Sequence, residues 1–503
     1  MTTTLIKRIV IAGGGTAGWV AASTISQQLG PQLDITLIES EEIGTVGVGE
    51  STVPPLRAFN GRNGIDEQEF MRATAATFKL GIWFENWKQI GDRYIHPFGR
   101  NGQPTWLCEF QHFWLRSLEL GMTAGLGDYC AEWVAAKEGK FATGPNSEIN
   151  FAYHIDAALY AKFLRKIAER NGVKRVEGKI KSVNLNAESG YIESLTMNSG
   201  QIIEGDLFID CTGFRGLLIE QALHTGFEDW SHWLPCDTAV AVQTENNGPV
   251  MPYTSAIAHK AGWRWHIPLQ HRSGNGWVYC SRYMSDDEAA AELVKATAGK
   301  IVKDPWIVKI RTGRRRKAWH KNCVAVGLAG GFVEPLESTS IHMIIMGVAR
   351  LMNLFPYNGI QQSLVDQYNN ESRAEIEHIR DFIILHYNTT ERDDTAFWRY
   401  CKHMSIPEGL QHRIRLFRET AMAFQNSGEL FRTDSWSHVM LGQGIMPENY
   451  HPFARGMDAN ELKKYLTTFS SSISRAVAAL PTHQQFVDQY CPANVDVWGQ
   501  PMR

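Results

Sequence analysis

The segment from Arg8 to Glu39 limits the possible folds of this chain more than any other. Its first part, "RIVIAGGGTAGWVAASTISQQLG", predicts a buried strand, a glycine turn and a helix, and "DITLIES" predicts a second strand. Gly13, Gly15 and Gly18 have the spacing G-x-G-x-x-G, and Glu39 ends the second strand about 20 residues later. Such glycines let the backbone of the turn approach a pyrophosphate at the helix N-terminus, and the carboxylate suits ribose hydroxyls. The segment therefore predicts a dinucleotide-binding βαβ unit, with Thr16 and Ala17 as further contacts; the alternative is a glycine turn with a structural role only.

Further glycine-rich turns favour FAD over an exchanging NAD as the dinucleotide. "DCTGFRG" follows a predicted strand that ends at Asp210, and the strand, turn and helix pattern in "NCVAVGLAGGFVEPLESTSIHMIIMGVARLMNLF" contains Gly327. Several turns around one cofactor indicate a long ligand that stays bound, so we predict FAD. The turn in "VGVGESTVPPLR" adds four candidate contacts: Gly49, Glu50, Ser51 and Thr52.

The order of these patterns predicts an α/β protein built on a FAD-binding, Rossmann-like module. Nucleotide-type elements near the start and again near residue 330 indicate that this module is discontinuous over residues 1–357. Within it, residues 235–310 form a strand-rich insert, and we expect residues 90–150 to line a pocket. Apolar stripes of helical period predict a mainly helical substrate module over residues 358–503.

Composition and charge exclude several classes of function. The 503-residue chain has a formal net charge of −3, so no overall field attracts nucleic acid or an anionic membrane surface. Its eight cysteines include no C-x-x-C pair, which argues against a zinc site or a disulfide framework, and we expect no metal. The apolar run at the start is too short for a signal peptide, and none reaches the length of a membrane span. We therefore expect a cytoplasmic protein. We also expect it to be a monomer or a homodimer.

One dense basic run, "RRRK" from Arg314 to Lys317, stands out against the balanced charge. Because short basic strings occur on many unrelated surfaces, we interpret it as a solvated strand edge. The alternative is a patch that steers or contacts anions.

Eight strings spread over most of the chain form a recognisable set: "GGGTAGW", "GVGESTVP", "ATFKLGIWFENW", "HPF", "DCTGFRGLL", "WRWHIP", "EPLEST" and "RDDTAFWRY". The W-x-W-x-I-P string together with the lysine in "TFKLGI" is highly specific. Through these strings the chain resembles the flavin-dependent tryptophan halogenases, and the resemblance implies a FAD-binding module of the flavin monooxygenase type. The resemblance implies that a separate flavin reductase supplies reduced FAD, which forms a flavin hydroperoxide with dioxygen. Chloride or bromide then yields hypohalous acid. This oxidant passes through a tunnel to a separately held substrate and halogenates an electron-rich, indole-type ring.

Trp263 and Trp265 are expected on the same face of one strand, since side chains alternate along a strand, and Pro268 closes it. From the residues alone, two packed core tryptophans are the simpler interpretation. The resemblance implies instead that the two indoles fill the space beside the flavin and keep the organic substrate away from it. Such a wall would turn a monooxygenase framework into a generator of hypohalous acid.

Lys79 lies among apolar residues in "ATFKLGI", where loss of hydration lowers the pKa of an amine. The resemblance implies that it either hydrogen-bonds hypohalous acid or carries the halogen as a haloamine. The alternative is a lysine at a helix edge with its ammonium in solvent.

Glu337, in "EPLEST", matches the second catalytic residue of the family, which stabilises the cationic ring intermediate and accepts the departing proton. The alternative is a carboxylate that only favours a helix N-terminus. Thr339 and Ser340 follow at the predicted helix start, where free N–H groups favour a halide site. The family often has glycine at the position of Ser340, so this side chain leaves the halide position and preference open.

His96 and Phe98, in "YIHPFG", match a His-x-Phe pair that lines the aromatic pocket of the family, an arrangement that suits a flat, electron-rich ring. A turn residue beside Pro97 is the alternative for His96. Tryptophan-specific members bind the charged end of the amino acid with a Tyr-Tyr pair, which this chain lacks. "FRTDSWSHVMLGQGIMPENYHPF" offers only Tyr450, so we predict that a neutral indole or phenol is preferred.

Two other functions remain open at this point. A flavin-dependent aromatic hydroxylase on the same fold would insert oxygen without halide and without a role for Lys79. A flavin-binding protein without redox chemistry would hold FAD only. Fold alone does not separate these possibilities, because function depends on the site.

Overall fold

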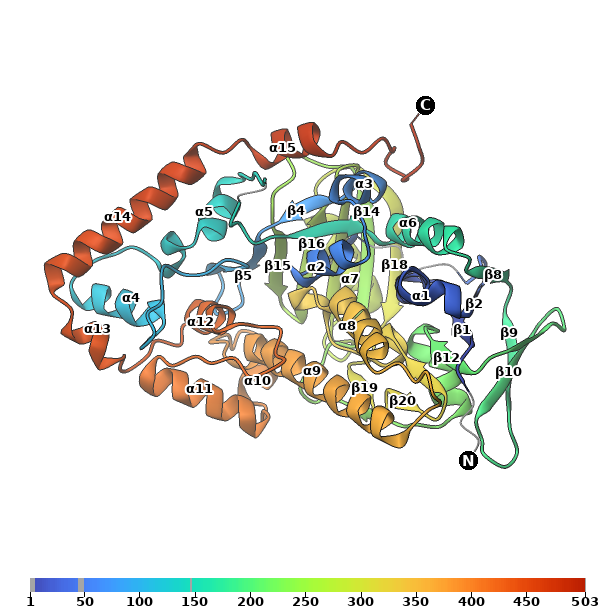
Figure 1. The fold of residues 1–503 in the computed structure, drawn as a ribbon. Helices are drawn as coiled ribbons and strands as arrows, with labels where there is room; N and C mark the ends of the chain where they lie inside the picture. Colours follow the sequence, from blue (N-terminus) through green and yellow to red (C-terminus); the bar gives the residue numbers. More distant parts are fainter. Residues whose placement is uncertain (1–4, 44–48, 145–146, 503) are drawn as a thin grey trace. The chain divides into compact units, whose positions relative to one another are not determined.

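The computed structural model describes residues 5–43, 49–144 and 147–502, and the chain divides into two compact units (Figure 1). Each unit is assembled from three separate segments of the chain. Unit 1 consists of Met1–Ala75, Ile155–Leu234 and Lys309–Glu377. Unit 2 consists of Ala76–His154, Pro235–Val308 and His378–Arg503. The expected division of cofactor and substrate binding near residue 357 stays a prediction.

Unit 1 contains a six-stranded, mostly parallel sheet with the strand order β20-β21-β12-β1-β2-β8. β1 pairs in parallel with β2 on one side and with β12 on the other, and β12 pairs in parallel with β21. After its first residue β1 is apolar and buried, as expected for a central parallel strand. The strands are β1 (Arg8–Ala12), β2 (Asp34–Glu39), β8 (Lys174–Glu177), β12 (Leu207–Asp210), β20 (Trp319–His320) and β21 (Cys323–Ala325).

Helix α1 (Thr16–Leu29) joins β1 to β2, which confirms the predicted βαβ unit. It buries a continuous run from Gly18 to Ser26 and packs against α6 (Ala157–Arg170) and α8 (Ser340–Asn353) (Figure 1). The other helices of unit 1 are α2 (Pro55–Arg62), α3 (Glu67–Ala73) and the first part of α9 (Gln362–Asn388). The smaller strands are β3 (Gly49–Ser51), β9 (Ile180–Leu185), β10 (Ile192–Met197), β11 (Ile202–Glu204), β13 (Phe227–Asp229), β19 (Gly313–Arg315) and β22 (Gly331–Phe332).

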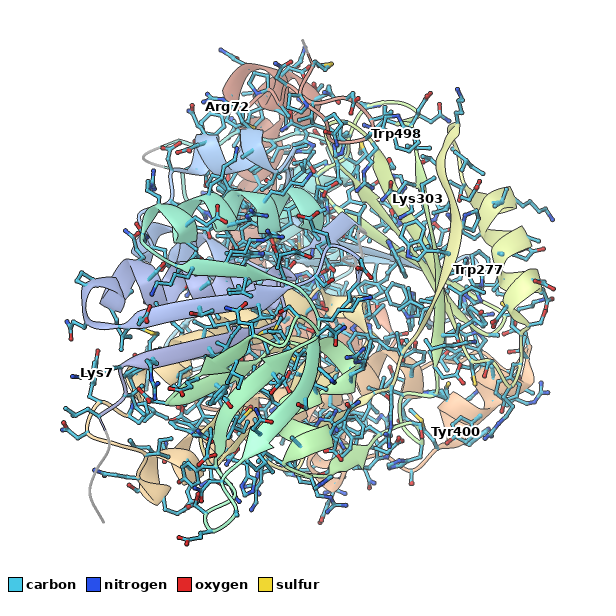
Figure 2. The ribbon with its side chains drawn as sticks, turned by 90° about the vertical axis from the view of Figure 1, so that its right-hand side faces the viewer. Lys7, Arg72, Trp277, Lys303, Tyr400 and Trp498 are labelled. Atoms are coloured by element: carbon cyan, nitrogen blue, oxygen red, sulfur yellow. The ribbon has the colours of Figure 1, made fainter. Side chains whose placement is uncertain are left out.

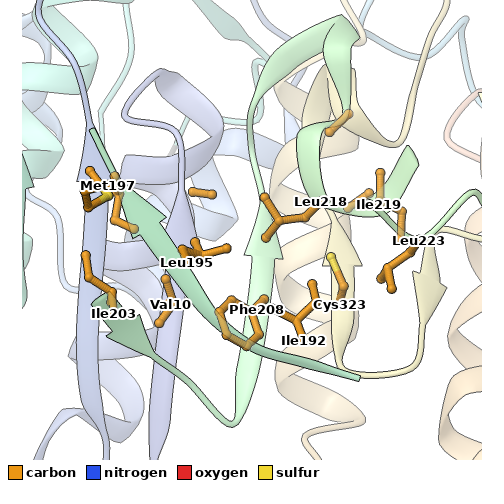
Figure 3. Close-up of a cluster of buried hydrophobic side chains, with 14 residues drawn as sticks. Val10, Ile192, Leu195, Met197, Ile203, Phe208, Leu218, Ile219, Leu223 and Cys323 are labelled. Atoms are coloured by element: carbon orange, nitrogen blue, oxygen red, sulfur yellow. The ribbon is translucent and has the colours of Figure 1, made fainter. Parts of the chain in front are cut away.

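One buried cluster joins the main sheet to the three-stranded sheet β11-β10-β9 (Figure 3). Val10, Phe208 and Cys323 contribute from the parallel strands β1, β12 and β21. Ile192 and Leu195 contribute from β10. Because interiors are closely packed, this cluster fixes the three parallel strands, and so the turns that follow them.

The basic run is not the solvated strand edge that we expected. Arg314 and Arg315 belong to β19 and have side chains that are 12% and 7% exposed. Arg314 forms ion pairs with Glu228 and Glu377, and Arg315 pairs with Glu220. These acidic partners are distant in sequence, so the basic string alone could not reveal them. Within the run, the exposed residues are Arg316 and Lys317.

Unit 2 is built around a seven-stranded sheet with the order β18-β14-β17-β16-β15-β5-β6. On one face, α7 (Asp286–Ala296) covers a cluster that includes Trp277 of β17, labelled in Figure 2. Since side chains alternate, Trp263 and Trp265 of β16 belong to the other face. The strands are β5 (Gly81–Glu85), β6 (Arg93–Pro97), β14 (Thr238–Thr244), β15 (Thr254–His259), β16 (Gly262–Pro268), β17 (Ser273–Tyr279) and β18 (Ile301–Lys309).

The strand β4 (Thr77–Lys79) pairs antiparallel with β7 (Ala152–Asp156). The C-terminal part of unit 2 is helical, as predicted, and α14 packs against α4 and α5 (Figure 1). Among the residues that the structure describes, no helix is both long and apolar enough to cross a membrane. The helices are α4 (Phe110–Glu119), α5 (Ala131–Glu138), α10 (Ala396–His403), α11 (Glu408–Thr420), α12 (Thr433–Gly442), α13 (Pro452–Gly456), α14 (Ala459–Ala478) and α15 (His483–Tyr490).

Candidate active site

The cofactor candidates of unit 1 follow the carboxyl ends of parallel strands. The first glycine turn follows β1, Glu39 ends β2, and Gly327 comes shortly after β21. Residues 13–17 are partly exposed, although the strand before them is buried. Ligands of open parallel sheets bind at this edge. The edge therefore offers the accessible backbone that a dinucleotide requires.

The first turn needs glycine for close packing and leaves space at its centre. A Cβ atom on Gly13, which has a φ of 110°, would lie 2.3 Å from the carbonyl oxygen of Cys211. A Cβ on Gly18 would lie 1.8 Å from the carbonyl oxygen of Gly13. At Gly15, the residue before α1, a Cβ would meet no atom within 4 Å. This open position at a helix N-terminus fits a pyrophosphate.

Glu39 already has protein partners. Its carboxylate accepts hydrogen bonds from Nε of Arg175 at 2.5 Å and from the indole N–H of Trp19 at 3.2 Å. A carboxylate has about four acceptor positions, so Glu39 can still accept from ribose hydroxyls. The ion pair holds the carboxylate at the end of β2, beside Gly14 of the turn.

The second group of candidates, Gly49 to Thr52, includes the short strand β3. Burial raises the pKa of Glu50 to about 7. The hydroxyl of Ser338 donates a hydrogen bond to Oγ of Ser51 at 3.0 Å, which ties this segment to the turn before α8. Thr52 is buried. The preceding residues of the motif, 46–48, lie outside the described part of the chain.

Gly327 brings another turn against the first. Its φ is 67°, and a Cβ at this position would lie 2.9 Å from Cβ of Ala17 at the start of α1. Asp210, at the end of β12, instead accepts hydrogen bonds from the backbone N–H groups of Thr212, Leu218 and Ile219. Asp210 therefore stabilises its own turn, while Gly327 allows the close approach at α1.

Glu337 is fully buried in the short helical turn Pro335–Glu337. Ser338 follows with a φ of 62°, and α8 begins at Ser340 with Thr339 as its N-cap, as predicted. Thr339 is also fully buried, and its hydroxyl has no hydrogen-bond partner among the described residues. A buried hydroxyl without a partner is costly, and here it lies next to the free N–H groups of a helix start.

Lys79 is the last residue of β4 and is fully buried. Its Nζ lies 4.8 Å from the centroid of the Phe98 ring, a cation–π distance. The alternative of a solvated lysine at a helix edge is therefore wrong. The backbone explains the contact, because N–H of Phe98 donates to the carbonyl of Leu80, the residue after Lys79.

Trp263 and Trp265 are buried side by side on β16, with ring centroids 6.1 Å apart. Across the sheet, Trp265 pairs with Gly276 of β17. A Cβ on Gly276 would lie 2.0 Å from the Trp265 ring, so the glycine makes room for this indole. The indole N–H of Trp265 has no hydrogen-bond partner among the described residues. Pro268 ends the strand as predicted.

His96, in β6, is buried in an aromatic cluster that sequence reasoning did not find. Its ring centroid lies 5.5 Å from that of Phe382, which stacks on Phe431 at 3.8 Å and contacts Trp436 at 4.7 Å. The rings of His96 and Phe98 are 6.4 Å apart. The three missed residues come from α9, a loop and α12, and they carry no shared motif. The only sequence signal is the aromatic pair within "FRTDSW".

The candidate residues thus fall into two groups. Unit 1 contains the glycine turns, Glu39, Glu50 and the Glu337 to Ser340 segment, whereas unit 2 contains Lys79 with its aromatic neighbours. Glycine turns at the carboxyl edge of a parallel sheet are typical of a dinucleotide-binding enzyme, and this is the class that unit 1 indicates.

Comparison with known proteins identifies its family. The family model for tryptophan halogenase matches residues 8–459, and the chain belongs to this family. It is a flavin-dependent halogenase that uses reduced FAD and halide to halogenate an indole-type aromatic substrate. The hydroxylase alternative is not favoured, and a flavin-binding protein without chemistry is ruled out, because the chain is an enzyme of this class.

Relatives and solved structures cover almost the whole chain. Tryptophan 7-halogenase RebH of Lentzea aerocolonigenes is 36% identical over 89% of this chain and 91% of its own length. Xcc4156, a flavin-dependent halogenase from Xanthomonas campestris, is 52% identical, with a TM-score of 0.96 over 97% of this chain and 99% of its own. BrvH, a flavin-dependent halogenase from Brevundimonas sp. BAL3, is 43% identical, with a TM-score of 0.93 over the same shares. These similarities confirm the predicted α/β fold class.

Proposed function

We propose that this halogenase acts on an uncharged indole or phenol derivative in preference to free tryptophan, at the ring carbon with the highest electron density. The observation that carries the proposal is the bonding of Tyr450. Its hydroxyl donates a hydrogen bond to Glu119, and its ring packs in the apolar cluster between α4 and α14. Tyr450 is the one tyrosine in the segment where an anchor for the amino acid would be expected. Both its hydroxyl and its ring already have partners within the protein.

The helix that follows the aromatic cluster supports the same substrate class. Val439 and Met440 of α12 are fully buried, and Ile445 is also buried. A zwitterion that enters such surroundings loses hydration, at a cost of roughly 1–3 kcal/mol for each polar group left unpaired. An uncharged indole avoids this cost and gains stacking contacts with rings such as Phe431 and Trp436.

Lys79 is proposed as the residue that delivers the halogen. When bound, reduced FAD would supply two of the four electrons that reduce dioxygen, and the halide would supply the other two as it is oxidised to hypohalous acid. Lys79 either donates a hydrogen bond to this acid or carries its halogen as a haloamine. The Phe98 ring beside Nζ supports the role, because it keeps the amine within aromatic surroundings that exclude water.

Glu337 is proposed as the base of the substitution step. A buried carboxylate next to the reacting ring stabilises the developing cation and accepts the proton from the carbon that receives the halogen. Its full burial and its place in a tight turn before α8 support this role.

Thr339 and Ser340 are proposed to bind the halide. The buried hydroxyl of Thr339, which has no partner among the described residues, would donate to the anion, together with the N–H groups at the start of α8. Ser340 adds a second hydroxyl at this point. The pair therefore suits chloride or bromide.

Trp263 and Trp265 are proposed to keep the organic substrate away from the flavin, with Pro268 ending their strand. The cofactor itself is assigned to the turns of unit 1: Gly13, Gly15, Thr16, Ala17, Gly18, Glu39, Gly49, Glu50, Ser51, Thr52 and Gly327. A separate flavin reductase supplies the reduced FAD by diffusion. A cytoplasmic location and a monomeric or homodimeric state stay predictions.

Side-by-side conversion of indole and tryptophan at equal concentrations tests the substrate proposal. The reaction contains a generic flavin reductase, FAD, NADH and either chloride or bromide, and mass spectrometry reads halogen isotope patterns. We expect clearly higher conversion of indole. Tyr450→Phe is the matched variant, and it should leave the preference unchanged, because Glu119 and not the substrate is its partner. A strong preference for tryptophan, or a preference that changes in Tyr450→Phe, would contradict the proposal.

A further inference from the structure

The strand that carries Lys79 is connected to the strand of the paired tryptophans by a buried polar chain. The hydroxyl of Thr77, two residues before Lys79 in β4, donates to the carbonyl of Pro268 at 2.7 Å. The same oxygen lies 2.9 Å from Nδ1 of His154 in β7, and Nε2 of His154 lies 2.9 Å from the hydroxyl of Thr254 in β15. Thr77 and His154 are fully buried, and Thr254 is 4% exposed.

Elementary chemistry determines which group donates and which accepts in each of these hydrogen bonds. A carbonyl oxygen only accepts, so Thr77 uses its single proton on Pro268 and must accept a hydrogen bond from Nδ1–H of His154. Burial, with Lys79, His483 and His266 nearby, lowers the pKa of His154 well below its ordinary value, so the imidazole is neutral. Its Nε2 therefore accepts from the hydroxyl of Thr254. The three hydrogen bonds therefore all donate in one direction, from Thr254 through His154 and Thr77 to Pro268.

A second neutral histidine fixes the backbone of the same strand. Nε2 of His483 accepts the backbone N–H of Phe78 at 3.1 Å, and its Nδ1–H donates to the carbonyl of Val250 at 2.8 Å. Burial lowers the pKa of His483 to about 4. Both imidazoles are thus held in a single tautomer, and β4 is fixed through a side chain at Thr77 and through the backbone at Phe78.

A packing role alone does not require this arrangement. Burying polar groups costs free energy unless every partner is present, and well-packed apolar residues would stabilise a core equally well. A hydrogen-bond network in which every group has its partner also fixes the register between the strands that it joins. Here these strands bear the proposed halogen carrier at one end and the proposed wall at the other, since Pro268 closes the strand of Trp263 and Trp265.

We propose that Thr77 and His154 are positioning residues that hold Lys79 at a fixed distance from the Trp263–Trp265 strand, so that Nζ intercepts hypohalous acid before it escapes. The proposal rests on the function assigned to Lys79. Misplacement of a catalytic group by about 1 Å can reduce a rate by roughly 10²-fold. The expected defect is a loss of oxidant transfer, without a loss of flavin oxidation.

The test compares Thr77→Val, which keeps the shape and removes both hydrogen bonds, with Thr77→Ser, which keeps the hydroxyl. Two products are measured in each reaction: the halogenated indole and the hypohalous acid captured by an external β-diketone scavenger. We expect Thr77→Val to lower the ratio of halogenated indole to captured acid roughly tenfold or more. The oxygen-dependent oxidation of reduced FAD should stay within about twofold of wild type. Thr77→Ser should keep the wild-type ratio.

His154 supplies a second pair of variants that does not depend on the folding of Thr77→Val. The amide nitrogen of His154→Asn can replace Nδ1 as the donor to Thr77, whereas His154→Leu removes the donor. We expect Asn to restore most of the ratio that Leu loses. The proposal is overturned if the two variants of each pair give the same ratio of halogenated indole to captured acid. It is also overturned if this ratio follows only the melting temperature of the variants.

Lys79→Ala, assayed in parallel, separates this proposal from the function on which it rests. If Lys79→Ala abolishes halogenation and the two pairs show no difference, the positioning role alone is wrong. If Lys79→Ala still halogenates indole, both the role of Lys79 and the positioning role are wrong.

Discussion

Nζ of Lys79 lies 4.8 Å from the centre of the Phe98 ring, and both side chains are buried. Lys79 is the last residue of β4, and Phe98 directly follows β6. The N–H of Phe98 donates a hydrogen bond to the carbonyl of Leu80, the residue after Lys79. An amine in this position is shielded from water but faces the electron-rich face of a ring. This arrangement suits a group that must receive a reactive halogen without losing it to solvent.

Replacement of Lys79 by alanine should abolish halogenation of the aromatic substrate while reduced FAD still reacts with oxygen. The reason is that alanine removes the amine that is proposed to receive the halogen, and leaves the glycine turns of unit 1 unchanged. Substrate halogenation is followed by mass spectrometry and flavin oxidation by absorbance. Lys79→Met, which keeps length and apolar packing, is the control for a packing effect. Halogenated product from either variant at near the wild-type rate would remove Lys79 from the mechanism.

Glu337→Gln should lower the rate of halogenation by roughly 10²–10⁴-fold. Glutamine keeps the size and hydrogen-bonding capacity of the side chain but cannot neutralise a ring cation or accept its proton. Hypohalous acid should still form and be captured by the scavenger. The matched control is Glu334→Gln, a second buried carboxylate in the same turn to which no catalytic role is assigned. Unchanged turnover in Glu337→Gln would reduce this residue to a structural role at the start of α8.

The parts of the site that depend on short stretches of chain were predictable from sequence. The strand, turn and helix around Gly13 and Gly15 form from local interactions, and alternation along one strand places Trp263 and Trp265 on one face. Phe382 and His154 were not predictable, because their partners lie far away in the chain and were brought together by tertiary packing.

The basic run from Arg314 to Lys317 also shows that a sequence pattern does not reveal distant partners. Its sequence indicates a solvated surface, yet Arg315 is 7% exposed and forms an ion pair with Glu220 at 3.0 Å. A charge pattern gives the sign of a residue but not its partner. Likewise, nothing in the sequence of Gly276 indicates that an indole from the neighbouring strand lies against it.

Gly276→Ala should move Trp265 and weaken the proposed wall between flavin and substrate. The new Cβ would lie 2.0 Å from the Trp265 ring, so the indole must shift, and such overpacking costs about 1–3 kcal/mol. We expect a lower melting temperature and more hypohalous acid captured outside the enzyme. Gly409→Ala in α11, where a Cβ meets no atom within 4 Å, is the control, and it should neither lower the melting temperature nor raise the amount of captured acid. Lower stability with an unchanged product-to-oxidant ratio would favour two tryptophans that only fill the core.

The stability of the fold should decrease in acid, and His483 should account for a defined part of this decrease. Its pKa in the folded protein is about 4, below the ordinary value of 6.5, so the unfolded chain binds more protons between these values. The contribution of neutral His483 is therefore complete above about pH 6.5 and is lost as the pH falls toward 4, by an amount on the order of 3 kcal/mol. The physical cause is burial, and protonation would also remove the acceptor that Nε2 presents to the N–H of Phe78.

His483→Asn removes the titration. Although this variant is less stable at every pH, its free energy of unfolding should fall less steeply than that of wild type between pH 7.5 and 5. Urea unfolding at several pH values measures both slopes, with exposed His412→Asn as the control that should keep the wild-type slope. Identical slopes for wild type and His483→Asn would show that His483 does not couple folding to protonation.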